Sequence, residues 1–252
     1  MKLRPRFPRL QLLFLFGSVL PLLGSAVAHA DVVYYKDNRP PQEVKILRVN
    51  GVLLEVQVAA GALGLPMNTI AKIEMAEPPE WATAKRLFAA KDYGNAVISV
   101  RGLVDKYKGL PLDWAAQVTG MLGDIYVAIG DLSRADAAYQ DFQKIYPGVG
   151  SMQAEVGRAR ILVATKKFAQ AKAKLEPVVE LALKDKAITP SAGFSYSHAF
   201  VAMGAIKESE GNLSGALEDY LRTVTIFYYD AAAVSEAQEH ADALIARKIN
   251  VP

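Results

Sequence analysis

One spacing pattern, repeated four times between residues 84 and 220, constrains the fold more than any other feature of the sequence. In each copy a small residue is followed twelve positions later by an alanine, and an aromatic residue or leucine stands three positions before that alanine. A bulky apolar residue follows the alanine after four more positions. In this order the copies read Ala84/Tyr93/Ala96/Val100, Gly123/Leu132/Ala135/Tyr139, Ala159/Phe168/Ala171/Leu175 and Gly204/Leu213/Ala216/Tyr220.

This spacing predicts pairs of antiparallel helices. Two helices cross closely only where both present small side chains, and larger residues one turn away fill the surrounding groove. Short polar turns separate the helices of each pair, at Lys91-Asp92, Gly130-Asp131, Lys166-Lys167 and Gly211-Asn212. One pair cannot bury its apolar face alone, so copies stack. We therefore expect a mainly α fold with four stacked helix pairs over residues 78–229 and a capping helix over residues 230–252.

The second copy resembles the tetratricopeptide-repeat (TPR) family. The matching residues are Leu122-Gly123, Tyr126, Gly130-Asp131-Leu132, Ala135, Tyr139 and Pro147. Other copies depart from the family: Lys207 stands where an aromatic residue is usual, and the alanines are 39, 36 and 45 residues apart, against about 34 in the family. The resemblance implies a TPR-like helical-repeat solenoid of an exported bacterial type. It names no partner, because one fold serves many functions.

In TPR stacks the first helix of each pair lines a concave groove that holds the partner. Carried over residue by residue, the resemblance implies a groove formed by Lys85, Phe88, Gln117, Asp124, Val127, Gln153, Arg160, Val163, His198, Ala205 and Glu208. We expect these side chains to be exposed, with Asp124 and Arg160 replaceable at little cost in stability. These residues carry charges of both signs, so the groove is not a uniformly positive site for a carboxylate or an acidic tail. The alternative that they are ordinary exposed residues without a binding role stays open.

Residues 31–77 follow a different period and predict a small β module. Leu54, Val56 and Val58 alternate with polar residues, as in a strand with one wet face. Asn50-Gly51 is a strong hairpin signal. We expect four or five short strands in a small curled sheet or SH3-like barrel. A unit this small is only marginally stable alone, so we expect it to be stabilised by packing against the helices that begin after Pro78-Pro79.

The first thirty residues have the layout of a secretory signal peptide. Basic residues from Lys2 to Arg9 precede the apolar run Leu10–Gly24, and Ala28-His29-Ala30 forms a small-residue box. This layout predicts cleavage before Asp31, a periplasmic or secreted product, and no stable membrane span after cleavage. An uncleaved anchor is the alternative, because residues 10–30 carry no charge and are long enough to span a bilayer.

Charge and cysteine content exclude several classes of function. The chain has 29 Lys and Arg against 26 Asp and Glu, but the leader holds four of the basic residues and no acidic ones. The rest is therefore close to neutral and has no long basic run, which argues against nucleic acid as a partner. Cysteine is absent, and this excludes disulfides, thiolate catalysis and cysteine-based zinc sites.

The sequence contains no recognisable catalytic motif. Neither His198 nor His240 belongs to a metal-spacing pattern, and there is no Gly-x-Ser-x-Gly turn and no phosphate-binding loop. We expect a non-catalytic scaffold or adaptor outside the cytoplasm, without cofactor or metal, that engages a protein, a peptide or a cell-envelope component. The alternatives are a self-associating structural module, in which the β unit or the capping helix pairs with another copy, and a glycan-directed enzyme.

Overall fold

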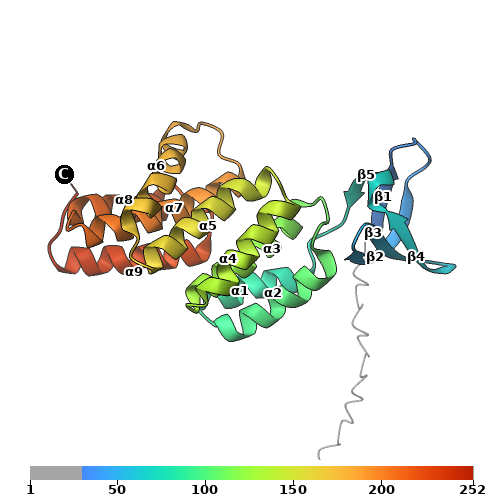
Figure 1. Cartoon of the computed structure of the whole chain (residues 1–252), viewed down its shortest axis with the longest axis horizontal. Helices are drawn as coiled ribbons and strands as arrows, with labels where there is room; N and C mark the ends of the chain where they lie inside the picture. Colours follow the sequence, from blue (N-terminus) through green and yellow to red (C-terminus); the bar gives the residue numbers. More distant parts are fainter. Residues whose placement is uncertain (1–29, 252) are drawn as a thin grey trace, which may run out of the picture.

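The computed structural model describes residues 30–251, with the side chains of residues 149–151 left out. The described chain is mainly helical, with nine α-helices after a five-stranded antiparallel sheet. The sheet lies at one end of an elongated molecule and the C-terminus at the other (Figure 1). The predicted signal peptide and its anchor alternative fall on residues 1–29, outside the described part.

The sheet contains β1 (Asp31–Tyr35), β2 (Gln42–Asn50), β3 (Leu53–Val58), β4 (Gly61–Pro66) and β5 (Ile70–Glu74), in the order β4-β3-β2-β1-β5. A short 3-10 helix, Met67–Thr69, precedes β5. The predicted hairpin is confirmed: Asn50 pairs with Leu53, and Gly51 has a φ of 61°. The expected four or five strands are confirmed as five, but no residues were assigned to β4 from the sequence, because this strand is glycine-rich and buries only Leu65. It forms through its regular pairing with β3.

The nine helices follow in close succession: α1 (Pro79–Ala89), α2 (Tyr93–Tyr107), α3 (Asp113–Ala128), α4 (Leu132–Ile145), α5 (Val149–Ala164), α6 (Phe168–Lys184), α7 (Pro190–Ser209), α8 (Leu213–Thr225) and α9 (Ala231–Ala246). Consecutive helices contact one another, and odd-numbered helices also contact the next odd one from α3 to α9. Helix α9 reaches back to touch α1. The odd-numbered helices therefore surround an inner side of the molecule.

The four turns within the helix pairs share one geometry. Each contains a residue with φ between 58° and 79°, namely Lys91, Gly130, Lys166 and Gly211. The next residue in each turn donates its backbone N–H to the carbonyl five positions earlier; these donors are Asp92, Asp131, Lys167 and Asn212. Three of the four donors also cap the following helix with their side chains. The same turn therefore joins the helices of every pair.

Close helix crossings lie where the spacing pattern predicts them. The ring of Tyr139 lies on Gly123, so a Cβ added to this glycine would stand 2.5 Å from Tyr139 Cε1. The same relationship holds between Gly204 and Tyr220, at 2.6 Å. The alanines of the pattern, 96, 135, 171 and 216, are fully buried. Pairs α3/α4 and α7/α8 thus approach through glycine on one helix and tyrosine on the other.

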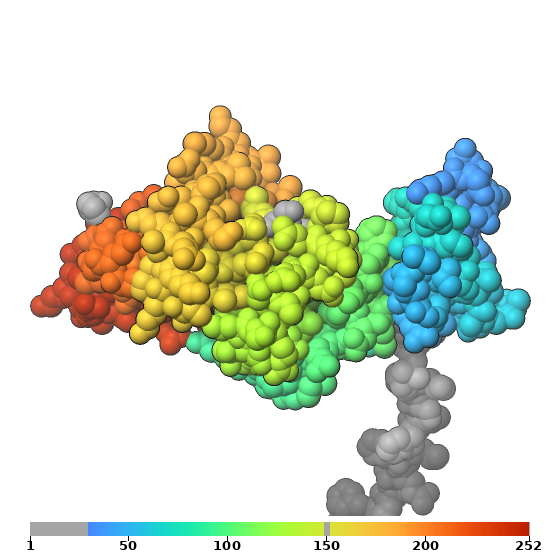
Figure 2. All heavy atoms as spheres, viewed as in Figure 1, coloured from blue at the N-terminus to red at the C-terminus, as the bar shows by residue number. Residues whose placement is uncertain are grey.

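The sheet and the first three helices share one hydrophobic core. Val33 and Ile46 of the sheet belong to the same buried cluster as Trp81, Leu103 and Trp114 of the helices. Figure 2 shows the sheet standing against the α2–α3 end of the helical body. The small sheet therefore does not depend on its own apolar area alone.

Candidate functional site

Four of the predicted groove residues line one cavity of about 310 Å³, which we call the inner cavity. They are Phe88, Val127, Arg160 and His198, from α1, α3, α5 and α7 respectively. The capping helix α9 supplies Glu236 on the remaining side. With Tyr93 at the start of α2, six helices therefore contribute to a single hollow.

The other predicted residues lie elsewhere. Lys85 is exposed, with its Nζ 3.4 Å from Glu77 Oε2. Gln117 and Ala205 are half-buried and do not line the inner cavity. Val163 packs partly buried against the cluster between α5, α6 and α7. Glu208 accepts a hydrogen bond from the hydroxyl of Tyr220 at 3.0 Å. Val163 and Glu208 thus contact neighbouring helices, and Lys85 faces solvent.

The expectation that the groove side chains are exposed is wrong for all of them except Lys85: Phe88 is 3% exposed, and the polar side chains are covered as well. Asp124, Gln153 and His198 are 2%, 6% and 2% exposed, and the Arg160 side chain is 11% exposed. The reason is that Asp124 points between helices, where it accepts hydrogen bonds from Tyr139 Oη and Arg160 Nη1, each at 2.7 Å. Gln153 Nε2 lies 3.5 Å from Oδ2, the second carboxylate oxygen of Asp124. The inner helices pack too closely to leave these polar groups in water.

Burial and charge act together in this network. Burial would lower the pKa of Arg160, but the neighbouring acidic groups together, with Asp124 contributing most among them, outweigh burial and raise it. Burial and the Asp124 charge both raise the pKa of Tyr139 well above its ordinary value. Arg160 is therefore a fixed cation and Tyr139 a fixed hydrogen-bond donor at neutral pH.

His198 is a buried polar residue in the cavity lining whose ring nitrogens can still form hydrogen bonds. Its Nε2 lies 3.3 Å from Oδ1 of Asp230, yet neither ring nitrogen completes a hydrogen bond within residues 30–251. The ring of Phe194 lies against it, with the centroids 4.7 Å apart. Burial would raise the pKa of Asp230, but contact with His198 and the N–H of Ala233 outweigh burial and lower it.

Helix α9 forms one wall of the inner cavity through Ala232 and Glu236, a role that its sequence did not reveal. Asp230 caps its N-terminus by accepting from the N–H of Ala233 at 2.9 Å. Further along, Glu239 forms an ion pair of 2.5 Å with Lys91 of the α1–α2 turn. Glu236 was missed as a site residue because the sequence indicates only that the last helix caps the repeat. The contact that brings α9 beside α1 joins residues that are far apart in sequence.

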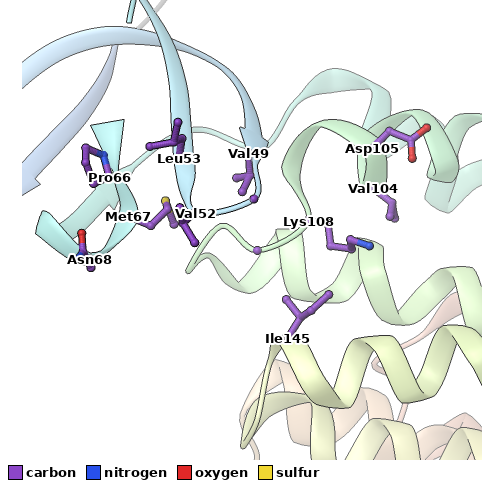
Figure 3. A pocket seen from close by; sticks show the side chains of 12 residues that line it. Val49, Val52, Leu53, Pro66, Met67, Asn68, Val104, Asp105, Lys108 and Ile145 are labelled. Atoms are coloured by element: carbon purple, nitrogen blue, oxygen red, sulfur yellow. The ribbon is translucent and has the colours of Figure 1, made fainter. Parts of the chain in front are cut away.

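A second and larger hollow, which we call the sheet cleft, lies between the sheet and the helices (Figure 3). It measures about 930 Å³. Val52 of the β2–β3 turn and Leu53 at the start of β3 border it and are 78% and 38% exposed. Val104 and Lys108 at the end of α2 form the opposite wall. The sequence could not indicate this cleft, because its walls come from separate elements that meet only in the folded chain.

The described residues contain neither a metal-binding cluster nor a membrane-crossing helix. Residues 30–251 contain no group of three or more His, Cys, Asp or Glu side chains placed to hold a metal ion. No described helix combines the length and apolar character that crossing a membrane requires. No family model, curated protein or solved structure matches this chain.

Proposed function

We propose that this chain is a non-catalytic binding scaffold with a TPR-like helical repeat, and that a protein or peptide partner docks at its inner cavity. The observation that carries the proposal is the convergence of Phe88, Val127, Arg160 and His198, from four different helices, on one hollow. Side chains gathered from successive inner helices are what a stacked repeat offers to a partner.

The repeat interpretation is supported by two recurring features. Each of the four turns has a residue with left-handed φ at the same position and the same backbone hydrogen bond after it. The glycine–tyrosine crossing of α3/α4 recurs in α7/α8. Repetition of a turn and of a crossing is expected when one structural unit has been copied along a chain.

The size of the cavity limits what the partner inserts. Because α9 packs across the inner side and touches α1, the groove is narrowed to about 310 Å³. This volume is at the lower end of ligand cavities. The partner therefore inserts a side chain or a short segment rather than a whole helix. From the predicted leader we further propose that this partner lies outside the cytoplasm, as a periplasmic or secreted protein or another cell-envelope component.

Site-specific photo-crosslinking tests this function. A benzoylphenylalanine placed at Val127 should form a discrete adduct in the cells that make the protein. The control carries the same group at Lys144, which is exposed on α4. A defined adduct from position 127 alone supports the scaffold function. Adducts from both positions, or from Lys144 alone, would remove the basis for the inner cavity as the docking site.

Self-association through the sheet cleft is a second candidate, because Val52 presents most of its apolar side chain to solvent beside Leu53. Exposed apolar patches of this kind often mark protein interfaces. Sedimentation velocity of the wild type and of Val52→Asp tests this candidate. An oligomer that dissociates with Val52→Asp but not with Ile98→Asp, a control at another exposed apolar site, would support it. A monomeric wild type would exclude it.

A further inference from the structure

The inner cavity contains a buried polar side chain that the protein itself leaves unsatisfied. His198 is 2% exposed and lines the cavity, and its Nδ1 has no partner within residues 30–251. A buried polar group without a hydrogen bond costs free energy. A ligand in the cavity that satisfies this ring would recover that cost.

The positive charges beside the cavity are already paired. Arg160 binds Asp124 at 2.7 Å, and Lys91 binds Glu239 at 2.5 Å. Each pair is neutral as a unit. Neither cation is therefore a free anchor for an anionic ligand.

Two carboxylates remain in excess of these pairs. Glu236 lines the cavity and, among the described residues, has neither a hydrogen bond nor an ion pair with another side chain. Asp230 lies beside His198, and its charge and that of Glu236 both act on Arg160. The cavity therefore carries surplus negative charge, and this favours a positively charged ligand.

The remaining walls are apolar and partly aromatic. Phe88 and Tyr93 form a tilted ring pair with centroids 5.6 Å apart, and both line the cavity with Val127. Aromatic rings attract cations, and apolar walls bind an alkyl chain. Exposed Lys91 and Ala128 border the same hollow, so it opens to solvent on their side.

From these observations we propose that the inner cavity binds a primary ammonium group on a short alkyl chain, with Glu236 as its counter-ion and His198 as a hydrogen-bond acceptor. The proposal rests on the scaffold function and names the chemistry of the group that the partner inserts. The same chemistry occurs in the lysine side chain of a peptide and in a free alkyl amine. A carboxylate ligand is the competing outcome, because Arg160 is also at the cavity wall.

Titration calorimetry on the chain from Asp31 tests the proposal with n-butylammonium, neutral n-butanol and butyrate. Butylammonium should bind, and the other two should not. Glu236→Gln should weaken binding at least about tenfold, as expected for loss of one charge-assisted hydrogen bond. Asp242→Asn, on the exposed side of α9 and outside the cavity lining, is the matched control and should change binding by no more than about twofold. Binding of butyrate alone, or equal affinity in wild type and Glu236→Gln, would overturn the proposal.

Two further arms complete the experiment. Val127→Phe adds volume at the cavity wall and should abolish butylammonium binding, whereas retained binding would place the ligand elsewhere. Acetyl-lysine-N-methylamide, which has a free side-chain amine, is compared with cadaverine, and the tighter ligand identifies a peptide or a free amine as the source. If butylammonium does not bind but crosslinking from position 127 persists, the ammonium proposal fails and the scaffold function stands. Loss of both overturns both.

Discussion

Arg160 Nη1 lies 2.7 Å from Asp124 Oδ1, and the two side chains are 11% and 3% exposed. The pair joins α5 to α3, and Tyr139 of α4 donates to the same carboxylate oxygen at 2.7 Å. Residues expected at the surface of a groove thus form a buried link between three helices. Their first role is in stability, and only Arg160 also faces the inner cavity.

Breaking this buried pair should destabilise the fold strongly. Asp124→Ala leaves Arg160 buried and unpaired, so we expect a loss of about 3–5 kcal/mol in the free energy of unfolding. The matched control is Glu155→Ala, which breaks a more exposed 2.7 Å pair with Lys174 and should cost at most about 1 kcal/mol. Urea unfolding followed by circular dichroism measures both. Similar losses in the two variants would show that the burial of Asp124 does not matter.

Adding one carbon at the α3/α4 crossing should also be costly. The new Cβ of Gly123→Ala would lie 2.5 Å from the ring of Tyr139, and overpacking of this kind typically costs about 1–3 kcal/mol. Gly102→Ala in α2 is the control, because a Cβ there meets nothing within 4 Å. It should be neutral or stabilise by up to about 1 kcal/mol through helix propensity. Thermal melts of the two variants test this prediction. A melting temperature of Gly123→Ala equal to that of the wild type would contradict the close crossing.

The shared turn geometry predicts a stabilising change. Lys166 has a φ of 58°, where two of the other three turns have glycine. The left-handed region is unfavourable for L-residues by about 1–2 kcal/mol, so Lys166→Gly should raise the melting temperature. The increase in stability is smaller than this, because glycine loses more backbone entropy on folding. The reciprocal variant Gly130→Lys should lower it. If both variants shift the melting temperature in the same direction, the turns are not equivalent.

The Asp230–His198 contact predicts a pH-dependent contribution to stability. The pKa of Asp230 is lowered from 3.8 in the folded protein, so its contribution is complete above the unfolded pKa and is lost as pH falls through the folded value. Asp230→Asn keeps a good helix cap but removes the charge. The variant should be less stable than wild type at pH 7, and the gap should narrow below about pH 4.

Urea unfolding between pH 7 and pH 3 measures this gap. Asp242→Asn, on the exposed side of the same helix, is the control and should show little difference from wild type at any pH. A gap for Asp230→Asn that stays constant down to pH 3 would mean that the carboxylate charge does not stabilise α9.

Local features of the sequence determined the secondary structure. The spacing of glycine, alanine and bulky residues predicted the helix pairs, because a close crossing needs small side chains at fixed intervals. The alternation around Leu54 and Val56 and the Asn50-Gly51 turn predicted the hairpin. Each of these signals lies within about twenty residues of sequence, so no knowledge of distant contacts was required. The residues of strand β4 were not recognised in the sequence, because their alternation is weak and the strand is defined by its pairing with β3.

The character of the inner side was decided only by the tertiary structure. Whether Asp124 faces water or Arg160 depends on how closely α5 packs on α3, and these residues are 36 positions apart. Helix α9 narrows the groove because its Glu239 reaches Lys91, which is 148 positions away. His198 and Glu236 share a cavity for the same reason. A one-dimensional pattern specifies which face of a helix is buried, but the contacts between helices that are distant in sequence depend on how all the helices pack together.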